Sequence, residues 1–174
     1  MRNDNRATPF QKSHSTELGG MCADSKANDS GDHHFCNNLF VTPSNPNVLD
    51  NSALPCFNVG NVFTKGTHSS KFDTSPLLAT DFEAGIKLEE KSDGWYLTLN
   101  EDPAWSNEVK RQLVTSGLLG KAKVSDCPYE NADGTPLRVD TDYLGTKRNE
   151  ENPFPGPLET KEGGKQTLKV WLNH

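Results

Sequence analysis

A short repeat, FCNNLFV at residues 35–41 and FNVGNVF at residues 57–63, decides the fold that we expect for this chain. Both copies contain an asparagine, then an aliphatic residue, then a phenylalanine, and the two asparagines, Asn38 and Asn61, are 23 residues apart. A spacing of about 20–25 residues suits one coil of a parallel β-helix, in which each coil buries its face only against its neighbours. The repeat therefore predicts two adjacent parallel strands that stack in register.

Asparagine suits equivalent positions of successive coils for two physical reasons. Its side chain tolerates left-handed turn conformations, and its amide can hydrogen-bond the same group one coil above. With the strands in register, Phe40 would stack on Phe63 inside the coils. The alternative is that the pattern recurs by chance in a sequence rich in asparagine.

The second half of the chain has a different pattern, which indicates antiparallel strands. Residues 86–99 contain two strand-like runs around the turn KSDG at 91–94, which predicts a β-hairpin. Residues 102–119 allow only a short helix, because a proline begins this stretch and glycines close it. Further strands are expected at 137–143 and 167–172, where apolar and polar residues alternate.

These patterns predict an all-β chain in two parts. We expect residues 1–85 to form the last coils of a parallel β-helix, together with their loops. Residues 86–174 would then form a small C-terminal β-region, antiparallel in its pairing and packed on the end of the coils.

The composition argues against several classes of partner and site. The net charge is −6 and no basic cluster is present, so nucleic acid is not expected as a partner. No apolar run is long enough to span a bilayer, and the first residues, MRNDNR, lack the apolar core of a signal peptide, so no membrane partner is expected. Four cysteines without a C-x-x-C pair give little support to a zinc site and leave disulfides open. We expect no metal and no cofactor, because phosphate-binding glycine loops and dinucleotide fingerprints are also missing.

Several motifs along the chain resemble those of one family. GDHHFCNNLF at 31–40, DGWYL at 93–97, DTDYLG at 140–145 and NPFPGP at 152–157 resemble the C-terminal part of right-handed parallel β-helix proteins often classed with glycoside hydrolases. The resemblance implies a right-handed helix and a polysaccharide or oligosaccharide as partner. Because such proteins are much longer and usually exported, it also implies that this chain is a fragment. Its full-length parent would be extracellular or periplasmic.

Glycoside hydrolysis needs two carboxyl groups that flank the scissile bond. We take Asp32 as the candidate catalytic residue and His33 and His34 as candidate substrate-binding residues, because three polar residues just before an apolar strand lie at a bend that faces a groove. His14 is a further candidate for substrate binding. The alternatives are that Asp32 caps a turn and that the histidines have structural or surface roles.

The role of the aromatic residues in the second half of the chain also has two interpretations. Trp95, Tyr96, Trp105 and Trp171 form either the core of the small β-region or a platform on which a sugar stacks.

The resemblance implies a C-terminal fragment of a glycoside hydrolase that acts on plant-cell-wall or host glycans, with an active site that is incomplete without further coils. A non-catalytic carbohydrate-binding or structural end-cap module is the alternative. The glycan, the retaining or inverting outcome and the oligomeric state stay open.

Overall fold

Strands dominate the secondary structure of this chain, which is all-β. The computed structural model describes residues 32–41, 46–123, 125–160 and 163–172. The strands are β1 (His34–Cys36), β2 (Leu39–Phe40), β3 (Phe57–Val59), β4 (Val62–Thr64), β5 (Leu77–Ala79), β6 (Lys87–Lys91), β7 (Gly94–Glu101), β8 (Val114–Thr115), β9 (Arg138–Val139) and β10 (Gly164–Leu172). The helices are short: the 3-10 helix η1 (Pro46–Asn51), α2 (Trp105–Glu108) and α3 (Ser116–Leu119).

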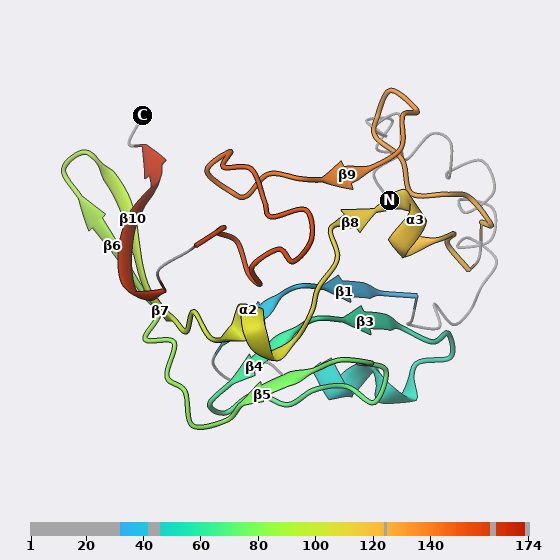
Figure 1. The fold of residues 1–174 in the computed structure, drawn as a ribbon, viewed down its shortest axis with the longest axis horizontal. Coiled ribbons are helices and arrows are strands. Elements are labelled where there is room, and N and C mark those ends of the chain that lie inside the picture. The colour runs from blue at the N-terminus through green and yellow to red at the C-terminus, as the bar shows by residue number, and fades with distance from the viewer. Residues whose placement is uncertain (1–31, 42–45, 124, 161–162, 173–174) are drawn as a thin grey trace, which may run out of the picture.

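The repeat forms two small parallel sheets, β1-β3 and β2-β4-β5 (Figure 1). The register places Phe40 opposite Phe63 and Phe35 opposite Asn58. The rings of Phe40 and Phe63 are stacked, with centroids 4.8 Å apart and planes inclined by 2°. The prediction that residues 35–41 and 57–63 are adjacent parallel strands in register is therefore confirmed.

The asparagines of the repeat also hydrogen-bond to one another. The Asn38 backbone N–H and its side-chain amide donate to Oδ1 of Asn61 at 2.9 and 3.2 Å. Nδ2 of Asn61 donates to the Phe35 carbonyl at 2.8 Å and to Oδ2 of Asp73 at 2.7 Å. Asn61 is fully buried, and its amide satisfies polar groups of two neighbouring segments, residues 35–38 and Asp73.

The left-handed bends belong to the residues just before these asparagines, which differs from our expectation. Asn37 has a φ of 57° and Gly60 a φ of 69°, and these two residues occupy equivalent positions between paired strands. A Cβ on Gly60 would lie 2.5 Å from Oδ1 of Asn37 and 3.1 Å from Cγ of Arg111. Glycine is therefore needed at the second bend both for its conformation and for the space.

The C-terminal half packs against one face of the sheet β2-β4-β5. Val62 and Leu77, in register on β4 and β5, form a buried cluster with Trp105 and Phe154. Arg111 is buried beside this cluster, and its guanidinium donates to the carbonyls of Gly60 and Trp105, both at 2.7 Å. These contacts connect the bend of the repeat to residues far along the chain.

The predicted hairpin is present: β6 and β7 pair antiparallel around residues 91–94, and β10 pairs with the other edge of β7. Figure 1 shows this sheet to the left of the parallel strands, with β8 and β9 above them. As predicted, the helices within residues 102–119 are short.

The strand expected over residues 137–143 is shorter than predicted, because only Arg138 and Val139 form β9. The carboxylate of Asp142 accepts the backbone N–H groups of Leu144 and Thr146, which turns the chain and ends the strand alternation.

Cys36, Cys56 and Cys127 are free thiols, and Cys22 lies outside the described residues. Among the helices that the structure describes, none is long and apolar enough to cross a membrane.

Phe63→Ala is expected to lower the free energy of unfolding by about 3–5 kcal/mol, because the ring is 1% exposed and stacked on Phe40. Leu78→Ala is the matched control, since Leu78 pairs with Phe63 in register but is 58% exposed, and its loss should be below about 1 kcal/mol. Urea denaturation of both variants measures the difference. Equal losses would contradict the stacked arrangement.

Candidate functional site

Asp32, His34 and Tyr129 form a polar cluster at the amino-terminal end of β1. Nε2 of His34 lies 3.4 Å from Oδ1 of Asp32 and 3.4 Å from the Tyr129 hydroxyl oxygen. The side chains of Asp32 and His34 are only 13% and 11% exposed. The structure thus brings together two of the sequence-predicted residues and adds a tyrosine that sequence reasoning missed.

Asp32 holds a distant loop against this cluster. Its φ is 55°, a left-handed conformation that suits aspartate at a turn. Oδ2 accepts the backbone N–H of Lys123 at 2.7 Å, a contact between residues 91 positions apart. The carboxylate therefore anchors this loop, while the catalytic role and the turn-capping role of Asp32 both stay predictions.

The His34 ring is fixed by aromatic neighbours. Its centroid lies 4.9 Å from that of Tyr129 and 5.4 Å from that of Phe57, which follows from the register of His34 opposite Phe57. Nδ1 is buried and has no hydrogen-bond partner among the described residues. This buried nitrogen is therefore a hydrogen-bonding group that the described residues leave unsatisfied.

Ser116 positions Tyr129. Its hydroxyl donates to the Tyr129 carbonyl and accepts the Leu137 N–H at 2.7 Å. Burial, together with the charge of Asp32, raises the pKa of the Tyr129 hydroxyl, so this group stays protonated and able to donate near neutral pH.

The other two predicted histidines are placed differently. The side chain of His33 is exposed, with its ring 6.3 Å from that of Phe35, so it is available at the surface beside the cluster. His14 lies outside the described residues.

The partners that the structure shows for the Asp32 carboxylate are His34 and Lys123, and no second carboxyl group is among them. Within the described part of the chain, no three His, Cys, Asp or Glu side chains gather where they could hold a metal ion. The cluster can therefore hydrogen-bond hydroxyl groups, while a two-carboxylate reaction would need a partner from elsewhere.

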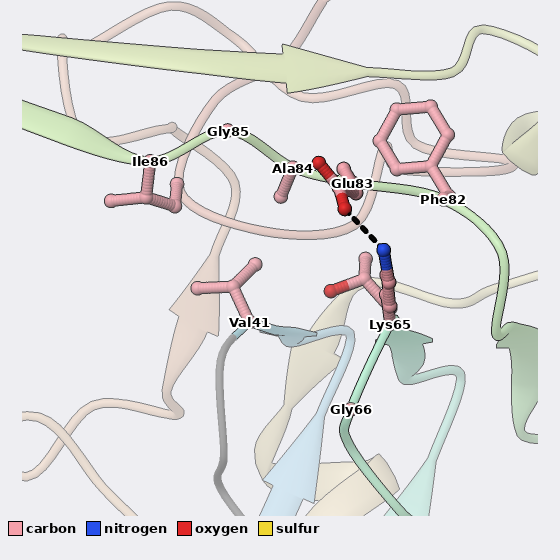
Figure 2. Close-up of a pocket in the computed structure, with 9 residues that line it drawn as sticks. Val41, Lys65, Gly66, Phe82, Glu83, Ala84, Gly85 and Ile86 are labelled. Atoms are coloured by element: carbon pink, nitrogen blue, oxygen red, sulfur yellow. Dashed lines mark hydrogen bonds and ion pairs between the residues drawn. The ribbon is translucent and has the colours of Figure 1, made fainter.

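A hollow of about 450 Å³ lies between the end of β4 and the segment that leads into β6. Figure 2 shows the Lys65 ammonium and the Glu83 carboxylate facing each other, with Val41 and Ile86 to one side and Phe82 to the other. The Glu83 hydrogen bond and charge raise the pKa of Lys65, and Lys65 in turn lowers the pKa of Glu83, so both groups are ionised near neutral pH.

The aromatic residues of the β-region divide between core and surface. Trp105 is 1% exposed and belongs to the core, whereas Trp171 is 60% exposed. Trp95 lies opposite Trp171 on β7 and lines a shallow hollow with it and with Tyr143. The core assignment is therefore confirmed for Trp105, whereas a sugar platform at Trp171 stays a prediction.

Glu101 is a buried carboxyl group outside these sites, at the end of β7. It is 1% exposed, and Nε2 of Gln166 donates to its Oε2 at 3.2 Å. Burial raises the pKa of Glu101 to about 7.

No protein-family model matches the chain, and no curated protein matches it in sequence. Among solved structures, the complex of XylC with xylose is similar to this chain, with a TM-score of 0.70 and 23% sequence identity. The match covers 81% of this chain and 26% of XylC, so the chain spans about a quarter of the length of XylC. At this identity the likeness shows a shared fold.

Glu101→Gln is expected to flatten the pH dependence of stability. Because the folded-state pKa of about 7 lies above the usual 4.5, the stability that protonated Glu101 contributes is present below about pH 4.5 and is lost as pH rises through about 7. The variant, which cannot ionise, should unfold at a higher temperature than the parent above pH 7. Thermal unfolding at several pH values measures this, with Glu90→Gln on exposed β6 as the control. Identical pH profiles of parent and Glu101→Gln would contradict the raised pKa.

Proposed function

We propose that this chain is part of a carbohydrate-active protein. The observation that carries the proposal is the shared fold with XylC, a protein whose structure was solved with xylose, over 81% of this chain. The polar cluster of Asp32, His34 and Tyr129 supports the same interpretation, because its ring nitrogen lies 3.4 Å from both a carboxylate and a hydroxyl. Sugar hydroxyls both donate and accept, so such a mixed set of groups suits them.

The parallel strands are proposed to be coils of a right-handed parallel β-helix. Support comes from the parallel pairing of β1 with β3 and of β2 with β4 and β5, and from equivalent bends at Asn37 and Gly60. In this proposal residues 1–85 supply the coils and residues 86–174 the C-terminal β-region.

The whole protein is proposed to be a glycoside hydrolase of plant-cell-wall or host glycans, located outside the cell or in the periplasm. Asp32 would supply one carboxyl group of the pair that the reaction needs, and His33 and His34 would bind sugar hydroxyls. The second carboxyl group would come from a part of the protein other than the neighbours of Asp32 described above.

A non-catalytic carbohydrate-binding module is the second candidate, and one observation favours it. Trp95, Tyr143 and Trp171 line a shallow surface hollow of the β-region, and Tyr143 is held there by donating its hydroxyl hydrogen bond to the Val170 carbonyl at 2.9 Å. The exposed rings of Tyr143 and Trp171 offer apolar faces for the C–H groups of a sugar ring.

The 174-residue chain is expected to bind a soluble glycan, such as a xylan oligosaccharide, and to leave aryl glycosides uncleaved. His34→Ala should weaken binding by about 10-fold, equivalent to about 1.4 kcal/mol, through loss of a ring nitrogen that meets a hydroxyl. Asp32→Asn keeps an oxygen that can accept the Lys123 N–H, so it should remain folded and show the effect of charge alone. Calorimetric titration measures the binding, and His68→Ala, an exposed histidine elsewhere, is the control.

The two candidate functions predict different results for Trp171→Ala. A surface platform requires this variant to lose binding while His34→Ala keeps it, whereas the Asp32 cluster requires the reverse. Absence of binding to any of a panel of plant and host glycans would remove the proposed function. Cleavage of an aryl glycoside by the parent chain, with full activity in Asp32→Asn, would remove Asp32 from the catalytic role.

A further inference from the structure

The hollow between β4 and β6 is separate from the Asp32 cluster. Asp32 lies before β1, the first described strand. Lys65 directly follows β4, so the two residues lie at opposite ends of the stretch from β1 to β4. No residue that lines the hollow belongs to the cluster. A ligand in the hollow would therefore leave Asp32 and His34 untouched.

The polar part of the hollow is an ion pair that water reaches. Lys65 and Glu83 are 61% and 69% exposed at their side chains, and both remain ionised near neutral pH because each stabilises the charge of the other. The backbone holds the two segments together, since the Lys65 N–H donates to the Phe82 carbonyl at 3.0 Å. This backbone contact keeps the donor Lys65 beside the acceptor Glu83.

The charges of this pair favour a neutral ligand with hydroxyl groups. Lys65 and Glu83 cancel each other, and the nearby Asp81, which also raises the pKa of Lys65, makes the local balance negative. An anion would meet this negative balance, while a hydroxyl can accept from the ammonium and donate to the carboxylate at once.

The rest of the wall is apolar or bare backbone. Val41, Phe82 and Ile86 surround the pair in Figure 2, and Gly66 contributes no side chain. Gly66 has a φ of 80°, and a Cβ built there would meet nothing within 4 Å, so a ligand has open access to its backbone. The volume of about 450 Å³ lies within the roughly 300–1,000 Å³ usual for small-molecule sites.

We propose that this hollow binds one neutral sugar unit, with its hydroxyls on Lys65 and Glu83 and its C–H groups against Phe82 and Ile86. The ligand class rests on the proposed function, but the site is distinct from the one around Asp32. The chain would then contact a glycan at two separate places.

An NMR titration of the full chain with xylose, glucose, glucuronate and glucosamine tests the proposal. The neutral sugars should shift the backbone amide signals of Gly66 and Gly85, and glucuronate should bind at least about 10-fold more weakly because of its charge. Lys65→Met should weaken binding of the neutral sugars by about 10-fold. Lys87→Met is the matched control, since Lys87 forms a similarly exposed ion pair with Glu89 outside the hollow.

Ile86→Trp is a second variant that keeps the ion pair and fills the hollow from an exposed position, so it should abolish the shifts without harming the fold. Equal or tighter binding of glucuronate would overturn the preference for a neutral ligand over an anion. Shifts confined to His34 and Tyr129 would overturn this site and leave the proposed function intact. Shifts at neither site, with any of the four sugars, would overturn both.

Discussion

The buried side-chain amide of Asn61 is the interaction on which the rest of this structure depends. Its oxygen accepts two hydrogen bonds from Asn38, and its nitrogen donates to Phe35 and to Asp73. An unpaired buried polar group costs about 1–3 kcal/mol, so only the arrangement that satisfies all of these groups together is stable. Because the amide joins segments on both sides, it fixes the register in which the parallel strands stack, and Phe40 then lies on Phe63.

That register also decides where the C-terminal half attaches. The bend at Gly60 presents its carbonyl to Arg111, and the paired side chains of Val62 and Leu77 give Trp105 an apolar surface. Arg111 is buried with carbonyl partners, and burial lowers the pKa of its guanidinium to about 10. A cation held in this way is stable only while those carbonyls point at it, so the bend and residues 105–111 are mutually dependent.

The candidate sites follow from this attachment in different ways. The Asp32 cluster is completed by Lys123 and Tyr129, which reach it only because the C-terminal half folds back along the parallel strands. The hollow at Lys65 depends instead on the short connection from β5 to β6, whose carbonyl at Phe82 pairs with the Lys65 backbone. Asp32 combines a structural contact with its candidate role, so a change at this residue acts on loop position as well as on ligand contacts. In the hollow, by contrast, the side chains of Lys65 and Glu83 are exposed, so a change at either residue acts mainly on ligand contacts.

The sequence by itself determined the features that arise from local order. The 23-residue spacing predicted the parallel pairs and the asparagine contact, and the turn at 91–94 predicted the β6–β7 hairpin. The sequence also placed Asp32 and His34 at one bend, at the start of β1. A repeat and a turn can both be recognised in the order of the residues, so these features are predicted from the sequence without the structure. Only the tertiary structure decided that Tyr129, 95 residues away, joins His34, that Asp142 closes a turn instead of extending a strand, and that Lys65 meets Glu83 beside a hollow. Such contacts depend on how whole segments pack, and no local pattern specifies which distant side chain fills a given space.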